Sequence, residues 1–181
     1  VSFRIFNADG SEAEISGNGL RCASAFLFHY QKVPGKVINF ETIVGEHLTE
    51  LITRDNSHFE IRTDMGQPKF SSKDIPFDDG SEHDFIIDYP LSINRKIYNI
   101  TCVSTGNPHC DIFVERFFPA RIEWHQIGQE VEHHPFFPNR TNVEFIRVLN
   151  RNEIEVLFWE RGVGETLASG TGACAAAVAS I

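Results

Sequence analysis

One pattern occurs twice in this chain and constrains its fold more than any other feature of the sequence. Residues 12–19 and 165–172 both read Glu-x-x-x-Ser-Gly-x-Gly, and each copy runs into a stretch of small residues typical of a helix start. Serine before glycine is common at helix N-termini, so a single copy would indicate only an ordinary capped turn. The shared glutamate, serine and two glycines instead favour an internal duplication, with one loop and one helix start in each of two lobes.

Such a loop has a definite chemical capacity. A Ser-Gly-x-Gly turn that begins a helix leaves several backbone N–H groups unpaired, and the helix dipole adds partial positive charge at the same point. Two such turns facing each other across a cleft would hold a carboxylate and present Ser16 and Ser169 to opposite sides of one carbon. Because inversion at an α-carbon removes a proton from one face and returns it to the other, the duplication favours racemisation or epimerisation.

The remaining patterns predict an α+β protein. Alternating or β-branched runs bounded by turn residues predict strands, mostly in antiparallel hairpins, at 36–42, 47–53, 58–64, 85–88, 96–104, 111–114, 143–148 and 154–160. Helical patterns cover 18–31, about 120–131, and 171 to the C-terminus. The turn-forming stretch 65–68 and the polar region 71–84 that follows mark the lobe boundary, so we expect lobes at 1–74 and 75–181.

Composition and charge exclude several kinds of partner. The net charge of −9, with acidic residues spread along the chain, leaves no basic stripe for nucleic acid. The four cysteines never form a Cys-x-x-Cys pair, so neither a metal site nor a redox dithiol is indicated. The sequence contains neither an apolar run of membrane-spanning length nor a signal-peptide pattern. We therefore expect a cytoplasmic protein without nucleic-acid or membrane partners.

Further polar residues suit a small zwitterionic ligand. Asparagine both donates and accepts, glutamate pairs with an ammonium group, and arginine binds a carboxylate with two N–H groups. Residues of these kinds, together with a histidine, are Asn7, Asn107, His109, Asn142, Glu160 and Arg161. Taken singly, each has an ordinary alternative: a turn, a structural histidine or a solvated ion pair. Their position beside the two repeats favours a binding site.

With these residues, the sequence resembles a known family, diaminopimelate epimerase. Five blocks carry the resemblance, in the family's order and at its intervals: Phe6–Glu12, Gly17–Cys22, Gly106–Cys110, Arg140–Val143 and Glu160–Thr166. The resemblance implies two pseudo-symmetric lobes, each a curled, mainly antiparallel sheet around a central helix, with the substrate between them. It also implies cofactor-independent conversion of LL-diaminopimelate to the meso isomer, a step of lysine and cell-wall biosynthesis.

Roles follow from the resemblance position by position. Ser16 and Ser169 occupy the places of the family's two catalytic cysteines, and His109 and Glu160 would tune the catalytic groups. The positions that would bind substrate carboxylates and amines are Asn7, Gly17, Asn18, Asn107, Asn142, Glu160, Arg161, Gly170 and Thr171.

Serine at both catalytic positions is the main departure from the family pattern. A cysteine thiol ionises near pH 8.5, whereas a serine hydroxyl is a far weaker acid and needs an adjacent base. Three explanations stay open: an epimerase impaired by replacement of its cysteines, a serine-based dehydratase or isomerase of the same fold, and a non-catalytic amino-acid-binding homologue. Homodimerisation also stays open. Compared with the family pattern, we expect the first lobe to lack its early strands and the second its closing strands.

Overall fold

The computed structural model describes the chain except for residues 7–9, 11 and 118–120 and the side chain of Arg121. The described residues form two compact units, Val1–Gly66 and Gln67–Ile181. The division falls inside the turn-forming stretch 65–68, eight residues before the expected lobe boundary after residue 74. Residues 67–74 pair within the second unit, since the Lys69 and Ser104 backbones bond to each other in both directions.

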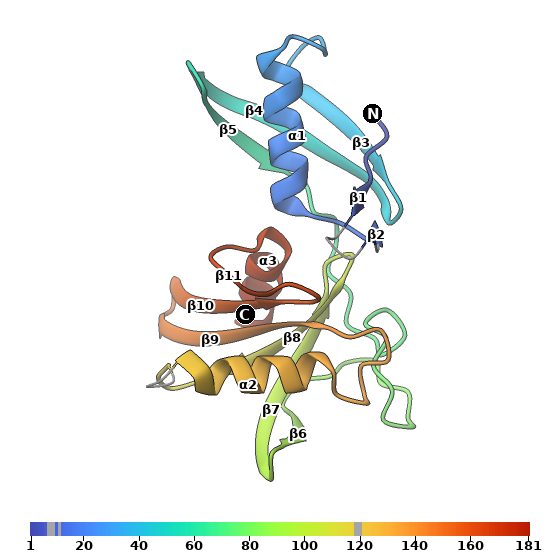
Figure 1. Cartoon of the computed structure of the whole chain (residues 1–181), viewed down its shortest axis with the longest axis vertical. Coiled ribbons are helices and arrows are strands. Elements are labelled where there is room, and N and C mark those ends of the chain that lie inside the picture. Colours follow the sequence, from blue (N-terminus) through green and yellow to red (C-terminus); the bar gives the residue numbers. More distant parts are fainter. Residues whose placement is uncertain (7–9, 11, 118–120) are drawn as a thin grey trace. The chain divides into compact units, whose positions relative to one another are not determined.

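The first unit places one helix against a three-stranded antiparallel sheet (Figure 1). Its elements are β1 (Ile5–Phe6), β2 (Glu12–Ala13), α1 (Gly17–His29), β3 (Val37–Thr42), β4 (Gly45–Asp55) and β5 (His58–Thr63). Leu20 and Phe28 lie eight positions apart on one face of α1 and pack with Ile38 and Phe40 of β3, which alternate inward as a half-buried strand requires. This core fixes the start of α1.

The second unit is a six-stranded sheet in the order β11-β10-β9-β8-β7-β6. The elements are β6 (Tyr89–Ile93), β7 (Lys96–Ser104), β8 (Pro108–Phe113), α2 (Arg121–Glu132), β9 (Asn142–Asn150), β10 (Glu153–Glu160), β11 (Gly164–Thr166) and α3 (Gly170–Ala179). All neighbouring strands are antiparallel except β8 and β9, which are parallel and are joined through α2. The predicted α+β class with mainly antiparallel sheets is confirmed.

Helices α2 and α3 cover opposite faces of this sheet (Figure 1). Trp124, Ile127 and Val131 of α2 belong to the main apolar core, which also contains Cys110 and Ile112 of β8. The alternate residues of the same strands point toward α3 instead, because side chains change face at every position of a strand. The polar residues of β8 and β9 are therefore collected under α3.

One expectation from the sequence is wrong. The run 85–88 is not a strand: Asp88 has a positive φ of 50°, which breaks extended backbone, and β6 begins at the next residue. Antiparallel pairing of β7 with β8 also sets Cys102 directly opposite Cys110 as two free, buried thiols. Among the described residues, none of the helices has the length and apolarity needed to cross a bilayer.

Candidate active site

The repeated motif builds the same local structure twice. Ser16 is the N-cap of α1, and its Oγ accepts a hydrogen bond from the Gly19 N–H at 3.0 Å. Ser169 is the N-cap of α3, and its Oγ accepts from the Gly172 N–H at 3.2 Å. Both serines are extended, as N-cap residues are. Each motif therefore presents one hydroxyl and a set of helix-start N–H groups at the same place.

The helix start of α3 also lies unusually close to the sheet. A Cβ added at Gly172 would stand 2.5 Å from Glu144 Oε1 and 3.0 Å from Phe158 Cδ1. Only glycine lets the helix backbone approach the sheet this closely. At the matching position of the first unit, a Cβ on Gly19 would meet side-chain atoms at 3.1 Å or more. The second copy of the motif is the more tightly packed of the two.

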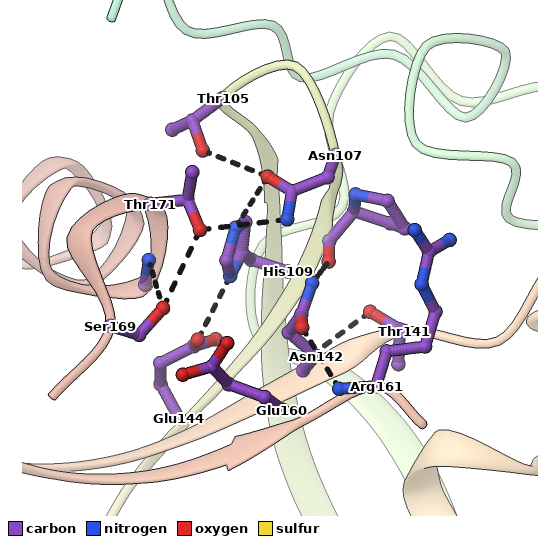
Figure 2. Close-up of polar contacts among 12 residues, drawn as sticks. Thr105, Asn107, His109, Thr141, Asn142, Glu144, Glu160, Arg161, Ser169 and Thr171 are labelled. Carbon is purple, nitrogen blue, oxygen red and sulfur yellow. Dashed lines mark hydrogen bonds and ion pairs between the residues drawn. The ribbon is translucent and has the colours of Figure 1, made fainter. Parts of the chain in front are cut away.

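Beneath α3, a chain of hydrogen bonds leads from Ser169 into the interior of the sheet (Figure 2). Ser169 Oγ lies 3.5 Å from Thr171 Oγ1, which accepts from Asn107 Nδ2 at 3.5 Å. Asn107 Oδ1 is 3.0 Å from His109 Nε2, and His109 Nδ1 is 2.8 Å from Glu144 Oε1. Thr105 Oγ1 donates to Asn107 Oδ1 at 3.4 Å. Residues from β8, β9 and α3 thus form one connected polar group.

Burial sets the protonation states of His109 and Glu144 in this hydrogen-bond chain. Burial lowers the pKa of His109 to about 4, and the nearby Asp111 and Glu160 charges offset only part of that effect. Burial also raises the pKa of Glu144 well above its usual range, and the charge of Glu160 adds to the increase. A neutral pair is therefore favoured over an ion pair at neutral pH. Glu144 then donates to His109 Nδ1, and the His109 Nε2–H donates to Asn107 Oδ1.

This protonation state fixes which group donates and which accepts in the other hydrogen bonds that lead to Ser169. Because Asn107 accepts through Oδ1, its amide group donates to the Thr171 hydroxyl, and that hydroxyl is left to donate to Ser169. Ser169 Oγ thereby accepts from Thr171 and from the Gly172 N–H. Its own hydrogen stays available for a ligand. In the part of the chain that the structure describes, neither direct partner of Ser169 is a base.

A second group gathers around the turn after β10. Asn142 Nδ2 donates to the Pro108 carbonyl at 2.8 Å, and Asn142 Oδ1 accepts from the Arg161 N–H at 2.9 Å. Glu160 Oε1 accepts from the Thr166 hydroxyl at 2.6 Å. In Figure 2, Glu160 lies on the side of Ser169 and Glu144, whereas Arg161 lies beside Asn142. Asn142 therefore ties the start of β8 to this turn through both ends of its amide.

Four predicted site residues belong to the first unit: Ser16, which caps α1, together with Gly17, Asn18 and Asn7. Gly17 begins α1, and the Asn18 side chain accepts from the Arg21 guanidinium. Asn7 lies outside the described residues. The structure thus brings together the predicted residues of the second unit, while the binding and catalytic roles of all of them stay predictions.

Glu144 and Thr105 belong to this polar group but were not predicted from the sequence. Glu144 follows Asn142 by two positions in a strand, so period-two alternation places both on the same face. That signal was available. What the sequence does not contain is the pairing of β9 beside β8, which sets Glu144 next to Asp111.

Asp111 is the least satisfied group under α3. Its side chain is fully buried, and neither carboxyl oxygen has a hydrogen-bond partner among the described residues. Burial, with the neighbouring Glu144 as a second cause, raises the pKa of Asp111 well above its usual range. The folded chain therefore keeps a proton that the unfolded chain releases above about pH 4. Stability falls as pH rises from there toward the folded-state pKa.

Substituting Asp111→Val should stabilise the protein. Removing an unsatisfied buried carboxyl should raise the free energy of unfolding by about 1–3 kcal/mol. The gain in unfolding free energy should be larger at pH 8 than at pH 5. In the wild-type chain Asp111 lowers the stability as pH rises, and the variant no longer has this carboxyl. Urea unfolding at both pH values measures it, with the exposed Asp84→Val as a control expected to change little. A loss of stability, or an equal gain at both pH values, would contradict this account of Asp111.

Comparison with known proteins identifies the family of the chain. A family model described as diaminopimelate epimerase matches residues 1–71 and 101–181. The diaminopimelate epimerase of Halothermothrix orenii is 46% identical over 179 residues, which are 98% of this chain and 62% of that protein. That of Moorella thermoacetica is 47% identical over 180 residues, covering 99% of this chain and 63% of the relative. This chain thus spans 62–63% of the length of these two relatives.

Solved structures support the same fold at low sequence identity. A hydroxyproline epimerase from Agrobacterium vitis, crystallised with trans-4-OH-L-proline, matches with a TM-score of 0.67 at 17% identity. The match covers 98% of this chain and 55% of that one, and it shows the fold alone. The family model, which matches most of the sequence, carries the assignment. The chain belongs to the diaminopimelate epimerase family.

Proposed function

We propose that this chain carries the substrate framework of a cofactor-independent epimerase that converts LL-diaminopimelate to the meso isomer. One observation carries the proposal within the family assignment: the repeated motif forms a serine-capped helix start in each unit. In the proposed complex, the two starts approach one substrate from opposite sides. Ser16 and Ser169 then flank the α-carbon, and proton removal on one face is matched by proton return on the other.

In this proposal, different polar residues around the loops bind different groups of the substrate. Backbone N–H groups of Gly17–Asn18 and Gly170–Thr171 hold the carboxylate at the reacting centre, where the helix dipoles favour negative charge. Glu160 and Arg161 bind the ammonium and carboxylate groups, together with three asparagines: Asn7, Asn107 and Asn142. His109 acts through Asn107 and Thr171 to orient Ser169, and Glu160 acts with it in tuning the catalytic pair.

Serine limits the rate of this chemistry. The hydrogen-bond chain connects the Ser169 hydroxyl to the His109 imidazole only through Thr171 and Asn107, so no base among the described residues accepts its proton directly. We therefore expect the site to bind diaminopimelate but to epimerise it slowly. This observation also favours a second candidate, a non-catalytic amino-acid-binding homologue. We further propose a cytoplasmic protein without nucleic-acid or membrane partners, for which homodimerisation stays open.

Ligand-induced stabilisation and α-proton exchange test the proposal together. At 100 times its dissociation constant, meso-diaminopimelate should add about 2.7 kcal/mol of stability and raise the melting temperature by roughly 5–10 °C. In deuterated water the α-proton should exchange slowly but measurably. The diamine 1,5-diaminopentane, which lacks both carboxylates, should do neither. Stabilisation without any exchange would support the binding homologue, and the absence of both effects would refute the proposed function.

A further inference from the structure

A buried carboxylate lies at the end of α2, away from the serine-capped helix. Glu132 is the last residue of this helix, and only 3% of it is exposed. Its Oε2 accepts from the Trp159 indole N–H at 2.7 Å, and its Oε1 accepts from the Gly162 N–H at 2.8 Å. The Arg140 guanidinium lies 3.6 Å from Oε1. A charge this deeply buried needs such partners to be tolerated.

Every group that faces Glu132 in these contacts is a donor. They are an indole N–H, a backbone N–H and, at ion-pair distance, a guanidinium. An ionised carboxylate accepts both N–H groups and attracts the guanidinium, because it carries two acceptor oxygens, a negative charge and no hydrogen. A glutamine of the same shape would turn an amide N–H toward one of these donors. The site therefore selects a carboxylate and not merely a side chain of this length.

The two short hydrogen bonds of Glu132 bracket the residues proposed to touch substrate. Trp159 precedes Glu160 and Arg161, and Gly162 follows them. Strand alternation turns Trp159 toward α2 and Glu160 toward the opposite face, where Ser169 lies. Fixing the residues on either side of Glu160 and Arg161 therefore sets the direction of both functional side chains.

Residues 159–165 form the hairpin between β10 and β11, and helix α2 packs along it. Gly128 lies one helical turn before Glu132, and a Cβ there would stand 2.8 Å from the Trp159 ring. On the other strand of the hairpin, Glu165 Oε2 is 2.5 Å from His125 Nε2. The helix thus contacts both strands of the hairpin and the turn between them, through Glu132, Gly128 and His125.

We propose that Glu132 is a positioning residue whose carboxylate holds the 159–165 hairpin so that Glu160 and Arg161 face the substrate. The inference rests on the proposed function for the identity of that substrate. The contacts of Glu132 with the hairpin do not depend on it. Glu132 itself touches no reacting atom and acts through the turn at Gly162.

Nuclear magnetic resonance on the Glu132→Gln chain tests the proposal without an activity assay. The chain has two tryptophans, so its two indole N–H signals are assigned with Trp124→Phe. In Glu132→Gln the Trp159 indole signal should shift, and the Gly162 amide should exchange with solvent at least about tenfold faster. The affinity for meso-diaminopimelate, measured by calorimetry, should fall about tenfold. Glu130→Gln, on the same helix and partly exposed, is the matched control and should change none of these.

The outcomes separate the two proposals. Gly162 exchange within twofold of wild type would overturn the role of Glu132, as would unchanged affinity despite a loosened hairpin. If the wild-type chain does not bind diaminopimelate, the proposed function fails, and the Gly162 and indole signals alone decide whether Glu132 fixes the hairpin. Should Glu132→Gln not fold, Trp159→Phe removes one of the two hydrogen bonds. Affinity should then fall two- to fivefold with Gly162 still protected, and unchanged affinity would again contradict the proposal.

Discussion

Replacing Ser16 and Ser169 together by cysteine should raise the rate of α-proton exchange into diaminopimelate at least about a thousandfold. A thiol ionises near pH 8.5, and a helix N-terminus lowers its pKa further, so thiolate is available at neutral pH. The serine hydroxyl is a weaker acid by several pKa units, and each unit corresponds to about 1.4 kcal/mol. Deuterium incorporation followed by mass spectrometry at pH 7.5 measures the difference between the two forms.

The single variants are the matched controls for this experiment. Because transfer from one face to the other needs an acid and a base, Ser16→Cys alone and Ser169→Cys alone should epimerise LL-diaminopimelate within about tenfold of the wild-type rate, even where one thiolate exchanges the α-proton on its own face. Epimerisation by a single variant as fast as by the double variant would contradict the two-base arrangement. A folded double variant that binds diaminopimelate but exchanges no faster than wild type would show that the serines do not stand at the reacting positions.

Substituting Gly172→Ala should destabilise the second unit by about 2–3 kcal/mol and abolish the connection of Ser169 to the buried polar chain. The added methyl would overlap Glu144 Oε1 at 2.5 Å, and that atom is held by His109. The helix start would have to move away from the sheet, and overpacking of this kind outweighs the better helix propensity of alanine. Urea unfolding monitored by tryptophan fluorescence reports on this unit, which contains both tryptophans.

Gly19→Ala, at the matching position of the first repeat, provides the control. There the neighbours include the ends of the Phe3 and Ile5 side chains, at 3.1 and 3.3 Å, which can rotate aside. We expect a change below about 1 kcal/mol. Equal destabilisation by the two substitutions would contradict the conclusion that only the second helix start is locked against the sheet.

The local parts of the site were predictable because they depend on neighbours in sequence. Serine followed by glycines determines a capped helix start through contacts three residues apart, and both copies of the motif behave alike. Strand runs with clear alternation, such as 96–104 and 154–160, form strands in the structure within a residue. The strand prediction for 85–88 was wrong because its apolar residues resemble a strand, whereas Asp88 adopts a left-handed backbone conformation.

The remainder of the site depends on contacts between distant segments. Cys102 meets Cys110 only because β7 and β8 pair in one register, and Glu144 reaches His109 only because β9 lies parallel to β8. Glu132 is an acidic residue at the end of α2, yet only 3% of it is exposed. Its partners Trp159 and Gly162 come from a hairpin that follows much later in the chain. No local pattern contains these pairings.

The central claim is that the two serine-capped loops bind the same molecule. Titrating the isotopically labelled chain with meso-diaminopimelate and following the amide signals of Gly17, Gly19, Gly170 and Gly172 tests it directly. We predict that all four signals shift along one curve with a single dissociation constant and saturate at one ligand per chain. Shifts confined to one loop, or two loops that titrate with different constants, would contradict the claim.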